Sequence, residues 1–147
     1  MADTMTRAQR SALMAKIRGR DTGPERAMRA ALHGAGFRFR LRGQRLPGTP
    51  DIVLARHRIA VFVHGCFWHR HAGCRLASTP ASNRAFWREK FRRNVQRDRR
   101  TARLLRARGW RVLTVWECQV RDAAKLSRAL QRVVRMARVS APARRAG

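Results

Sequence analysis

Three cysteines and one histidine have the types and the spacing of ligands for a single metal ion. Cys66, His71 and Cys74 lie in one short stretch, and Cys118 follows 44 residues later. Thiolate and imidazole are the ligands that zinc prefers, and four protein ligands leave no open coordination position. We therefore expect a structural zinc and not a reaction centre. The alternative is a set of buried free cysteines beside a surface histidine.

Two further histidines and two carboxylates are candidates for chemistry. His64 ends an apolar run, and His69 lies among the metal ligands without fitting their spacing. Imidazole is the side chain best placed to move a proton near neutral pH, although a core histidine such as His64 can be purely structural. Asp51 follows Pro50 and either closes a turn or holds magnesium, which takes only one or two carboxylates. Glu25 caps a helix, contacts a metal-bound water, or does both.

The charge of the chain indicates a polyanionic partner. Lys and Arg number 35 against 8 acidic residues, for a net charge of +27. Arginine forks onto phosphate oxygens, so nucleic acid is the first expectation. A codon bias combined with an acidic protein partner is the alternative. A membrane surface is disfavoured because the arginines are spread along the chain and are not gathered on an amphipathic anchor.

The aromatic residues near the metal ligands have two interpretations. Phe67 and Trp68 are adjacent, and Trp87 follows in the next predicted helix. Such residues commonly pack beside a metal site. In a DNA-binding protein they can instead wedge between base pairs, where unstacking costs least at a defective pair. The residues alone leave both interpretations open.

The elements that must position these residues follow from hydrophobic patterning. A chain of 147 residues predicts one domain (residues 21–139), with a basic arm at 1–20 and a disordered tail at 140–147. Thr22 and Glu25 have capping-box spacing for a first helix. The other expected elements are a half-exposed strand at 37–41, antiparallel strands at 51–55 and 59–63, a helix at 83–108, a strand at 110–116 and a helix at 121–139. This order predicts an α/β fold, one sheet with helices on both faces.

No secretory signal or transmembrane run is present, and the cysteine count is odd. These features predict a reduced, cytoplasmic protein and argue against a disulfide framework.

Several motifs together resemble the very-short-patch mismatch repair endonucleases (Vsr). The similarity covers about residues 6–120 and is most specific in the run from Gly65 to His69 and in the later Trp-Glu-Cys ending at Cys118. The other matching motifs are Thr22-x-Pro-Glu25, Gly48-Thr-Pro-Asp51-Ile-Val, Phe86-Trp-x-x-Lys90 and Asn94-Val-x-Arg-Asp98-Arg. The resemblance implies a variant of the PD-(D/E)XK restriction-endonuclease fold. It also implies a magnesium-dependent nick 5′ to the thymine of a G·T mismatch, which arises when 5-methylcytosine is deaminated.

The resemblance also implies a role for each candidate. Asp51 would bind magnesium with help from the main-chain carbonyl of Val63, and His69 would be the general base. Glu25 and His64 would contact metal-bound waters. The remaining implied sets are the zinc ligands Cys66, His71, Cys74 and Cys118, and the intercalating residues Phe67, Trp68 and Trp87. A monomer associated with the bacterial nucleoid is expected, and a MutL-like repair protein is a possible second partner.

One departure from the wider nuclease signature is shared by the Vsr proteins. The second acidic residue and the lysine are missing, and their strand positions carry Phe62 and His64. This departure weakens only the match to ordinary restriction enzymes. Two other functions compete with the nuclease on separate grounds. A non-catalytic, zinc-stabilised mismatch-binding module that recruits repair proteins would keep the charge, the aromatics and the zinc. A basic RNA-associated protein would explain the charge but neither the histidines nor the zinc pattern.

Overall fold

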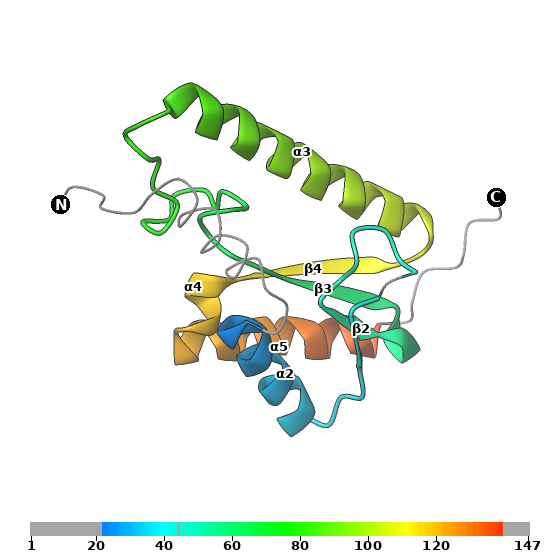
Figure 1. Ribbon diagram of the computed structural model, residues 1–147. Coiled ribbons are helices and arrows are strands. Elements are labelled where there is room, and N and C mark those ends of the chain that lie inside the picture. Colours follow the sequence, from blue (N-terminus) through cyan, green and yellow to red (C-terminus); the bar gives the residue numbers. More distant parts are fainter. Residues whose placement is uncertain (1–21, 44, 140–147) are drawn as a thin grey trace.

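The computed structural model describes residues 22–43 and 45–139 (Figure 1). The predicted arm (1–20) and tail (140–147) lie outside these residues. No helix within the described ranges is both long enough and apolar enough to cross a membrane.

The described strands form one mixed sheet of four in the order β1-β2-β3-β4. They are β1 (Arg40–Leu41), β2 (Ile52–Leu54), β3 (Ile59–His64) and β4 (Arg111–Trp116). The first three strands pair antiparallel, and β4 pairs parallel to β3. The predicted antiparallel pairing of the two apolar runs is confirmed. A short 3-10 helix, η1 (Ala55–His57), makes the turn between β2 and β3.

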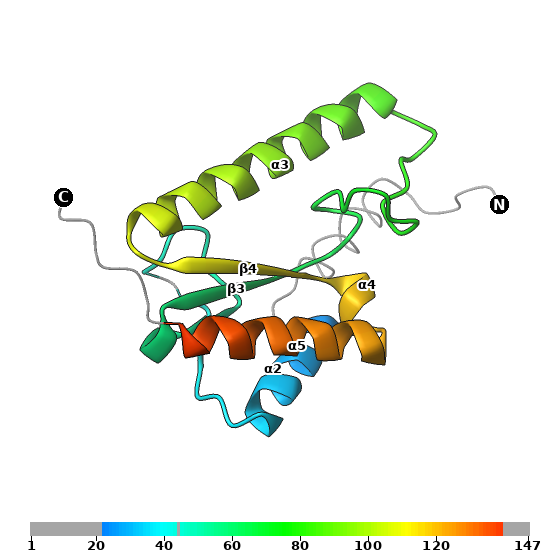
Figure 2. The ribbon, with the colours of Figure 1, turned by 180° about the vertical axis from the view of Figure 1, so that it is seen from behind.

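Helices cover both faces of the sheet, as the sequence pattern predicts. The helices are α2 (Gly23–Gly34), α3 (Arg84–Ala107), α4 (Glu117–Val120) and α5 (Ala123–Arg138). Figures 1 and 2 show α3 on one side of the sheet and α2 and α5 on the other. The helix α3 belongs to the crossover between the parallel strands β3 and β4. Such a connection needs a dozen or more residues and is usually helical.

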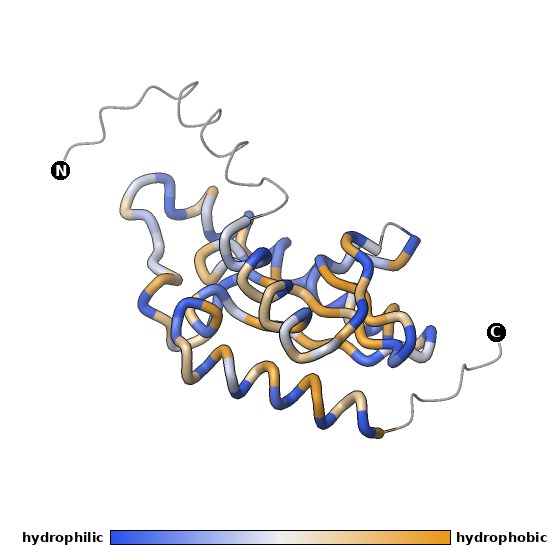
Figure 3. The backbone as a smooth tube through the Cα atoms, turned by 90° about the horizontal axis from the view of Figure 1, so that it is seen from below, coloured by the Kyte–Doolittle hydropathy of each residue, from blue (hydrophilic) through white to orange (hydrophobic). Residues whose placement is uncertain are grey.

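The alternation of side chains along β3 divides the core into two parts. Ile59, Val61 and Val63 pack into the larger cluster with α2 and α5. Ala60 and Phe62 point the other way and pack with Leu105 of α3, as the two-residue period of a strand requires. Figure 3 shows hydrophobic and hydrophilic residues alternating along α5, the helix that leads to the C-terminus. A helix with this pattern buries one face and exposes the other.

Two predicted boundaries need correction, and one element was missed. The strand expected at 37–41 is only two residues long, because only Arg40 and Leu41 pair with β2. The last helix begins at Ala123 and not at Arg121, since Asp122 Oδ1 accepts a hydrogen bond from Lys125 N (3.1 Å) and caps it. The short helix α4 was not predicted, and it carries Cys118.

Candidate functional site

The topology brings the candidate residues to one end of the sheet. Strands β3 and β4 are parallel and end together, with His64 opposite Trp116. Cys66 follows the end of β3 and Cys118 follows the end of β4, so the parallel pairing brings these cysteines near each other across the sequence. Because β2 is antiparallel to β3, Asp51, which comes just before β2, lies at the same end.

The four predicted metal ligands lie together. The candidate ligand atoms of Cys66, His71, Cys74 and Cys118 are all within 4.8 Å of one another. His71 Nδ1 is 3.7 Å from Cys66 Sγ and 3.4 Å from Cys118 Sγ. The four residues come from the loop after β3 and from α4, so a metal ion here would tie that loop to the end of β4. The predicted grouping is confirmed.

Without a cation, the thiol of Cys66 stays protonated. Burial, followed by the neighbouring thiols of Cys118 and Cys74, raises the pKa of Cys66 to about 12. A divalent cation reverses this preference, because a coordinating thiol is deprotonated outright. The geometry and the donor set therefore fit a closed site for a thiophilic metal such as zinc.

A second site lies beside the first, on the face of the sheet that α3 covers. Here a pocket of about 230 Å³ contains Asp51, His64 and His69, three of the four predicted catalytic residues. Asp98 and Arg97 of α3 complete its polar wall. The pocket therefore combines a carboxylate, two imidazoles and a guanidinium at the end of the sheet.

Asp51 is fixed by its backbone surroundings. Its Oδ2 accepts a hydrogen bond from Val63 N (2.7 Å). In an antiparallel pair the N–H and C=O of one residue point to the same neighbouring strand. The Val63 carbonyl oxygen therefore points, like the Val63 N–H, to the edge of β3 where Asp51 lies. Burial raises the pKa of Asp51 to about 6, the Val63 N–H opposes this, and the nearby charge of Glu25 adds to it. The Val63 carbonyl oxygen thus lies at this edge beside the Asp51 carboxylate, whose charged form a cation would stabilise.

Gly48 explains how the loop before Asp51 can reach α3. Its φ is +72°, and a Cβ there would lie 2.2 Å from Thr101 Cγ2 of α3. Such a Cβ would collide with the helix, and positive φ favours glycine. The close approach of Gly48 to Thr101 sets one wall of the pocket that contains Asp51.

His69 is oriented by a residue that we did not predict as part of the site. His69 Nδ1 and Asp98 Oδ2 are 2.7 Å apart. A carboxylate in this position is an acceptor, so Nδ1 carries the proton and Nε2 keeps a lone pair. Asp98 belongs to the motif Asn94-Val-x-Arg-Asp98-Arg, but an acidic residue in an arginine-rich helix is usually a solvated surface charge. The useful signal was that Asp98 and Glu89 are the acidic residues of α3.

His64 and His69 form a stacked pair of imidazoles. Their ring centroids are 3.7 Å apart, and their planes differ by 6°. Burial, together with the neighbouring charge of His69, lowers the pKa of His64 to about 4. His64 is therefore neutral near pH 7, and of the two imidazoles only that of His69 has a carboxylate partner among the hydrogen bonds of the described residues.

Glu25 lies outside the pocket but affects the ionisation of Asp51 inside it. It lies in the first turn of α2, where its backbone N–H donates to Thr22 Oγ1 (3.3 Å). This confirms Thr22 as the predicted cap. Glu25 does not line the pocket that contains Asp51, yet its charge raises the pKa of Asp51. Burial in turn raises the pKa of Glu25 itself.

The three predicted aromatic residues share one cluster next to the site. Phe67 lies 5.0 Å from Trp68 and 5.9 Å from Trp87, measured between ring centroids. Trp87 is 7% exposed, whereas Phe86 beside it is 60% exposed. Phe91 completes the packing of this cluster. Trp87 therefore stabilises the cluster in this conformation, and its more accessible members are Phe67, Trp68 and Phe86.

Comparisons with known proteins agree with this arrangement of residues. The family model described as DNA mismatch endonuclease Vsr matches residues 2–75. A DNA mismatch endonuclease Vsr from Escherichia coli is 46% identical over 127 residues, which cover 86% of this chain and 81% of that protein. A Type II nicking enzyme, V.XorIIP, from Xanthomonas oryzae pv. oryzae is 44% identical over 134 residues, 91% of this chain and 98% of its own.

A second nicking enzyme extends the match. The Type II nicking enzyme V.NmeAIP from Neisseria meningitidis is 41% identical over 135 residues, which cover 92% of this chain and 96% of that protein. Each of these three relatives covers more than four fifths of this chain. The chain therefore belongs to the Vsr family of DNA mismatch endonucleases.

Proposed function

We propose that this protein is a magnesium-dependent DNA endonuclease that nicks one strand 5′ to the thymine of a G·T mismatch and so starts very-short-patch repair. The observation that carries the proposal is the pocket in which the His69–Asp98 pair faces the same space as Asp51. Relatives with the same span are a mismatch endonuclease and nicking enzymes, which supports this reaction class.

The residues of the pocket have complementary roles in hydrolysis. His69 Nε2 takes a proton from a water molecule as the water oxygen forms a bond to phosphorus. Asp98 holds the imidazole in the required tautomer and stabilises its protonated form. The bond from phosphorus to the 3′ oxygen breaks, leaving a 5′ phosphate on the thymine side. His64 stays neutral, so it places no second positive charge beside His69 when His69 takes up the proton. Its ring can also hold a water molecule by hydrogen bonding.

The fit of magnesium rests on the oxygen donors at the Asp51 edge. Asp51 and the Val63 carbonyl would hold the ion, and Glu25 and His64 would contact its waters. Oxygen ligands, few carboxylates and retained waters are what magnesium prefers. When bound there, the ion supplies Lewis-acid stabilisation of charge on the phosphate and on the leaving 3′ oxygen.

The fit of zinc rests on the cluster of three cysteines and one histidine. Cys66, His71, Cys74 and Cys118 would hold it with all four positions filled, so its role would be structural. The loop that it closes contains Phe67, Trp68 and His69. Zinc would thus position both the general base and the aromatic residues.

The mismatch preference is attributed to the aromatic cluster. Phe67, Trp68 and Trp87 would enter the base stack beside the G·T pair, which costs less to open than a matched pair. Trp87 is buried, so its entry requires the cluster to rearrange. The more accessible Trp68 would lead. The large positive charge supplies the sequence-independent attraction to duplex phosphates.

The remaining assignments belong to the same proposal. The described sheet with flanking helices suits a variant of the PD-(D/E)XK restriction-endonuclease fold spanning residues 21–139. A monomer in the bacterial cytoplasm, at the nucleoid, suits an enzyme that acts on chromosomal DNA. A MutL-like protein is proposed as a repair partner.

A nicking assay separates this function from a non-catalytic mismatch-binding module. Duplexes that differ only in a central G·T or G·C pair are incubated with the protein and magnesium, and each strand is labelled separately. We expect one nick, in the thymine strand of the G·T duplex. Binding to the G·T duplex without any product would support the binding module, and equal cutting of both duplexes would remove the mismatch specificity.

The His69–Asp98 pair gives a separate prediction. Asp98→Asn should lower the single-turnover nicking rate by about 10²-fold or more, since the amide can donate to Nδ1 and favour the wrong tautomer. DNA affinity measured without magnesium should stay near the wild-type value. The matched control is Asp122→Asn, which removes the same charge at the start of α5, where asparagine also caps a helix well. A wild-type rate for Asp98→Asn would contradict a general-base role for the pair.

A further inference from the structure

One arginine lies where three grooves meet. Arg97 lines the pocket of about 230 Å³ that contains Asp51 and His69. It also lines a groove of about 730 Å³ beside Trp68 and Phe86, and another of about 980 Å³ along the arginine-rich outer face of α3. Among the residues that the structure describes, it is the only arginine lining the pocket with Asp51.

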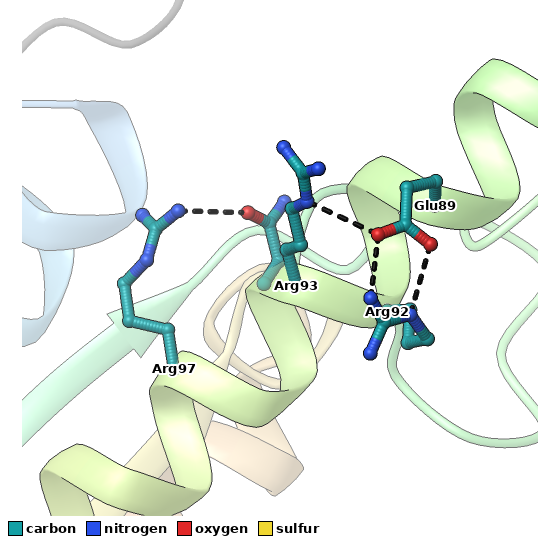
Figure 4. Close-up of polar contacts among 5 residues, drawn as sticks. Glu89, Arg92, Arg93 and Arg97 are labelled. Carbon is teal, nitrogen blue, oxygen red and sulfur yellow. Dashed lines mark hydrogen bonds and ion pairs between the residues drawn. The ribbon is translucent and has the colours of Figure 1, made fainter.

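The carboxylates near Arg97 are already engaged by other residues. Glu89 accepts hydrogen bonds from Arg92 Nε (2.9 Å) and Arg93 Nε (3.1 Å), as Figure 4 shows. The Asp98 carboxylate, next to Arg97 in sequence, is bound to His69. Glu89 therefore shares its single negative charge between two arginines one turn earlier, and Arg97 has no ion pair with another residue that the structure describes.

The side-chain amide of Asn94 makes a long hydrogen bond with Arg97 and also binds the backbone of Trp68 in the aromatic cluster. Arg97 Nη2 donates to Asn94 Oδ1 at 3.5 Å, and Asn94 Nδ2 donates to the Trp68 carbonyl at 3.1 Å. A guanidinium has five N–H donors, so this bond leaves most of them for a ligand. The side chain is exposed and can reach a phosphate without unfolding the site.

We propose that Arg97 is a catalytic residue that grips the scissile phosphodiester, its guanidinium donating to the two non-bridging oxygens. The inference rests on the proposed nicking function and adds a residue to it. A planar guanidinium matches two phosphate oxygens, which a lysine ammonium does not. From the junction of the grooves, Arg97 holds a phosphate against the His69–Asp98 pair while the adjoining nucleotides lie along the groove beside Trp68. Charge that develops on the phosphate strengthens this contact.

Single-turnover kinetics test the catalytic part. Arg97→Gln should slow nicking of a G·T duplex by about 10²-fold or more, the effect of removing one donor to a developing anion. Arg97→Lys should recover part of the loss. The matched control is Arg100→Gln, which removes the same charge from the same helix outside the pocket and should leave the rate constant unchanged. An equal fall in both glutamine variants, or none in Arg97→Gln, would overturn the proposal.

A binding experiment tests the contact without relying on turnover. The probe is a G·T duplex whose scissile phosphate is replaced by a neutral methylphosphonate, with affinity measured in the absence of magnesium. Wild type and Arg100→Gln should lose about tenfold or more in affinity on this replacement, the size of a charged hydrogen bond. Arg97→Gln should lose little, because its partner is already gone. A loss in Arg97→Gln equal to that of wild type would refute the contact.

The two measurements also separate failure of this inference from failure of the proposed function. If wild type nicks the G·T duplex and Arg97→Gln nicks it equally well, Arg97 has no catalytic role and the function stands. If wild type makes no nick, the proposed function fails, while the methylphosphonate comparison still decides whether Arg97 binds that phosphate.

Discussion

Asp51→Asn should yield a folded, DNA-binding protein whose magnesium-dependent nicking falls by about 10³-fold or more. The change removes the charge that would hold the ion, and a fall of that size corresponds to a few kcal/mol of lost transition-state stabilisation. Shape is preserved, because the asparagine oxygen can still accept from Val63 N. The measurement is single-turnover nicking of a G·T duplex, with affinity for the same duplex measured separately.

The stability of this variant supplies its internal control. The pKa of Asp51 in the folded protein is raised to about 6 from 3.8, mainly by burial. A raised carboxyl pKa means that ionisation opposes folding, and this cost is fully present above about pH 6. Asn avoids it, so the melting temperature at pH 7.5 should be no lower than that of wild type. Undiminished nicking by a variant of such stability would remove Asp51 from the chemistry.

The same pKa gives a pH dependence in the wild-type enzyme. As the pH falls through about 6, Asp51 takes up a proton and the ion must displace it. At limiting magnesium, nicking should therefore decrease between pH 7 and pH 5, and added magnesium should restore part of it. A decrease that is independent of the magnesium concentration would point to another titrating group.

The sequence predicted the local elements well because they depend on local patterning. The apolar runs that form β2 and β3 are separated by turn residues. The apolar residues on the buried face of α3, which include Trp87, Phe91 and Leu105, recur with helical periodicity. The shortness of β1 and the existence of the helix α4 were not predicted, because strand pairing and packing against other elements decide the extent of such elements. Propensity is a weak guide to such short elements.

The two halves of the site differed in how far the sequence could define them. The metal ligands were identifiable because cysteine and histidine at ligand spacing have few other uses. Their closeness to Cys118, however, depends on the parallel pairing of β3 with β4, which no local pattern reveals. Asp98 and Arg97 illustrate the opposite case. Each is one charged residue among many on α3, and only its position across from His69 and Asp51 distinguishes it from a solvated side chain.

Loss of the metal cluster should have the other large effect, on stability. We expect one zinc ion per chain, and His71→Ala should lose it. Structural zinc contributes on the order of 10 kcal/mol in small domains. If even a third of that were lost here, the melting temperature would fall by about 10 °C. The measurements are metal content and thermal unfolding, and the matched control is His33→Ala, which removes an exposed imidazole from the last turn of α2.

A chelator separates the loss of metal from the loss of packing. His71 also stacks on Trp116 at 4.3 Å, so His71→Ala removes a ring contact as well as a ligand. A chelator that prefers zinc to magnesium should lower the melting temperature of wild type and of His33→Ala but not that of His71→Ala. Nicking should fall with it even when magnesium is in excess, because the loop that the four ligands close contains His69. A wild-type protein that contains no zinc and ignores the chelator would leave hydrogen bonds and packing as the only support for that loop.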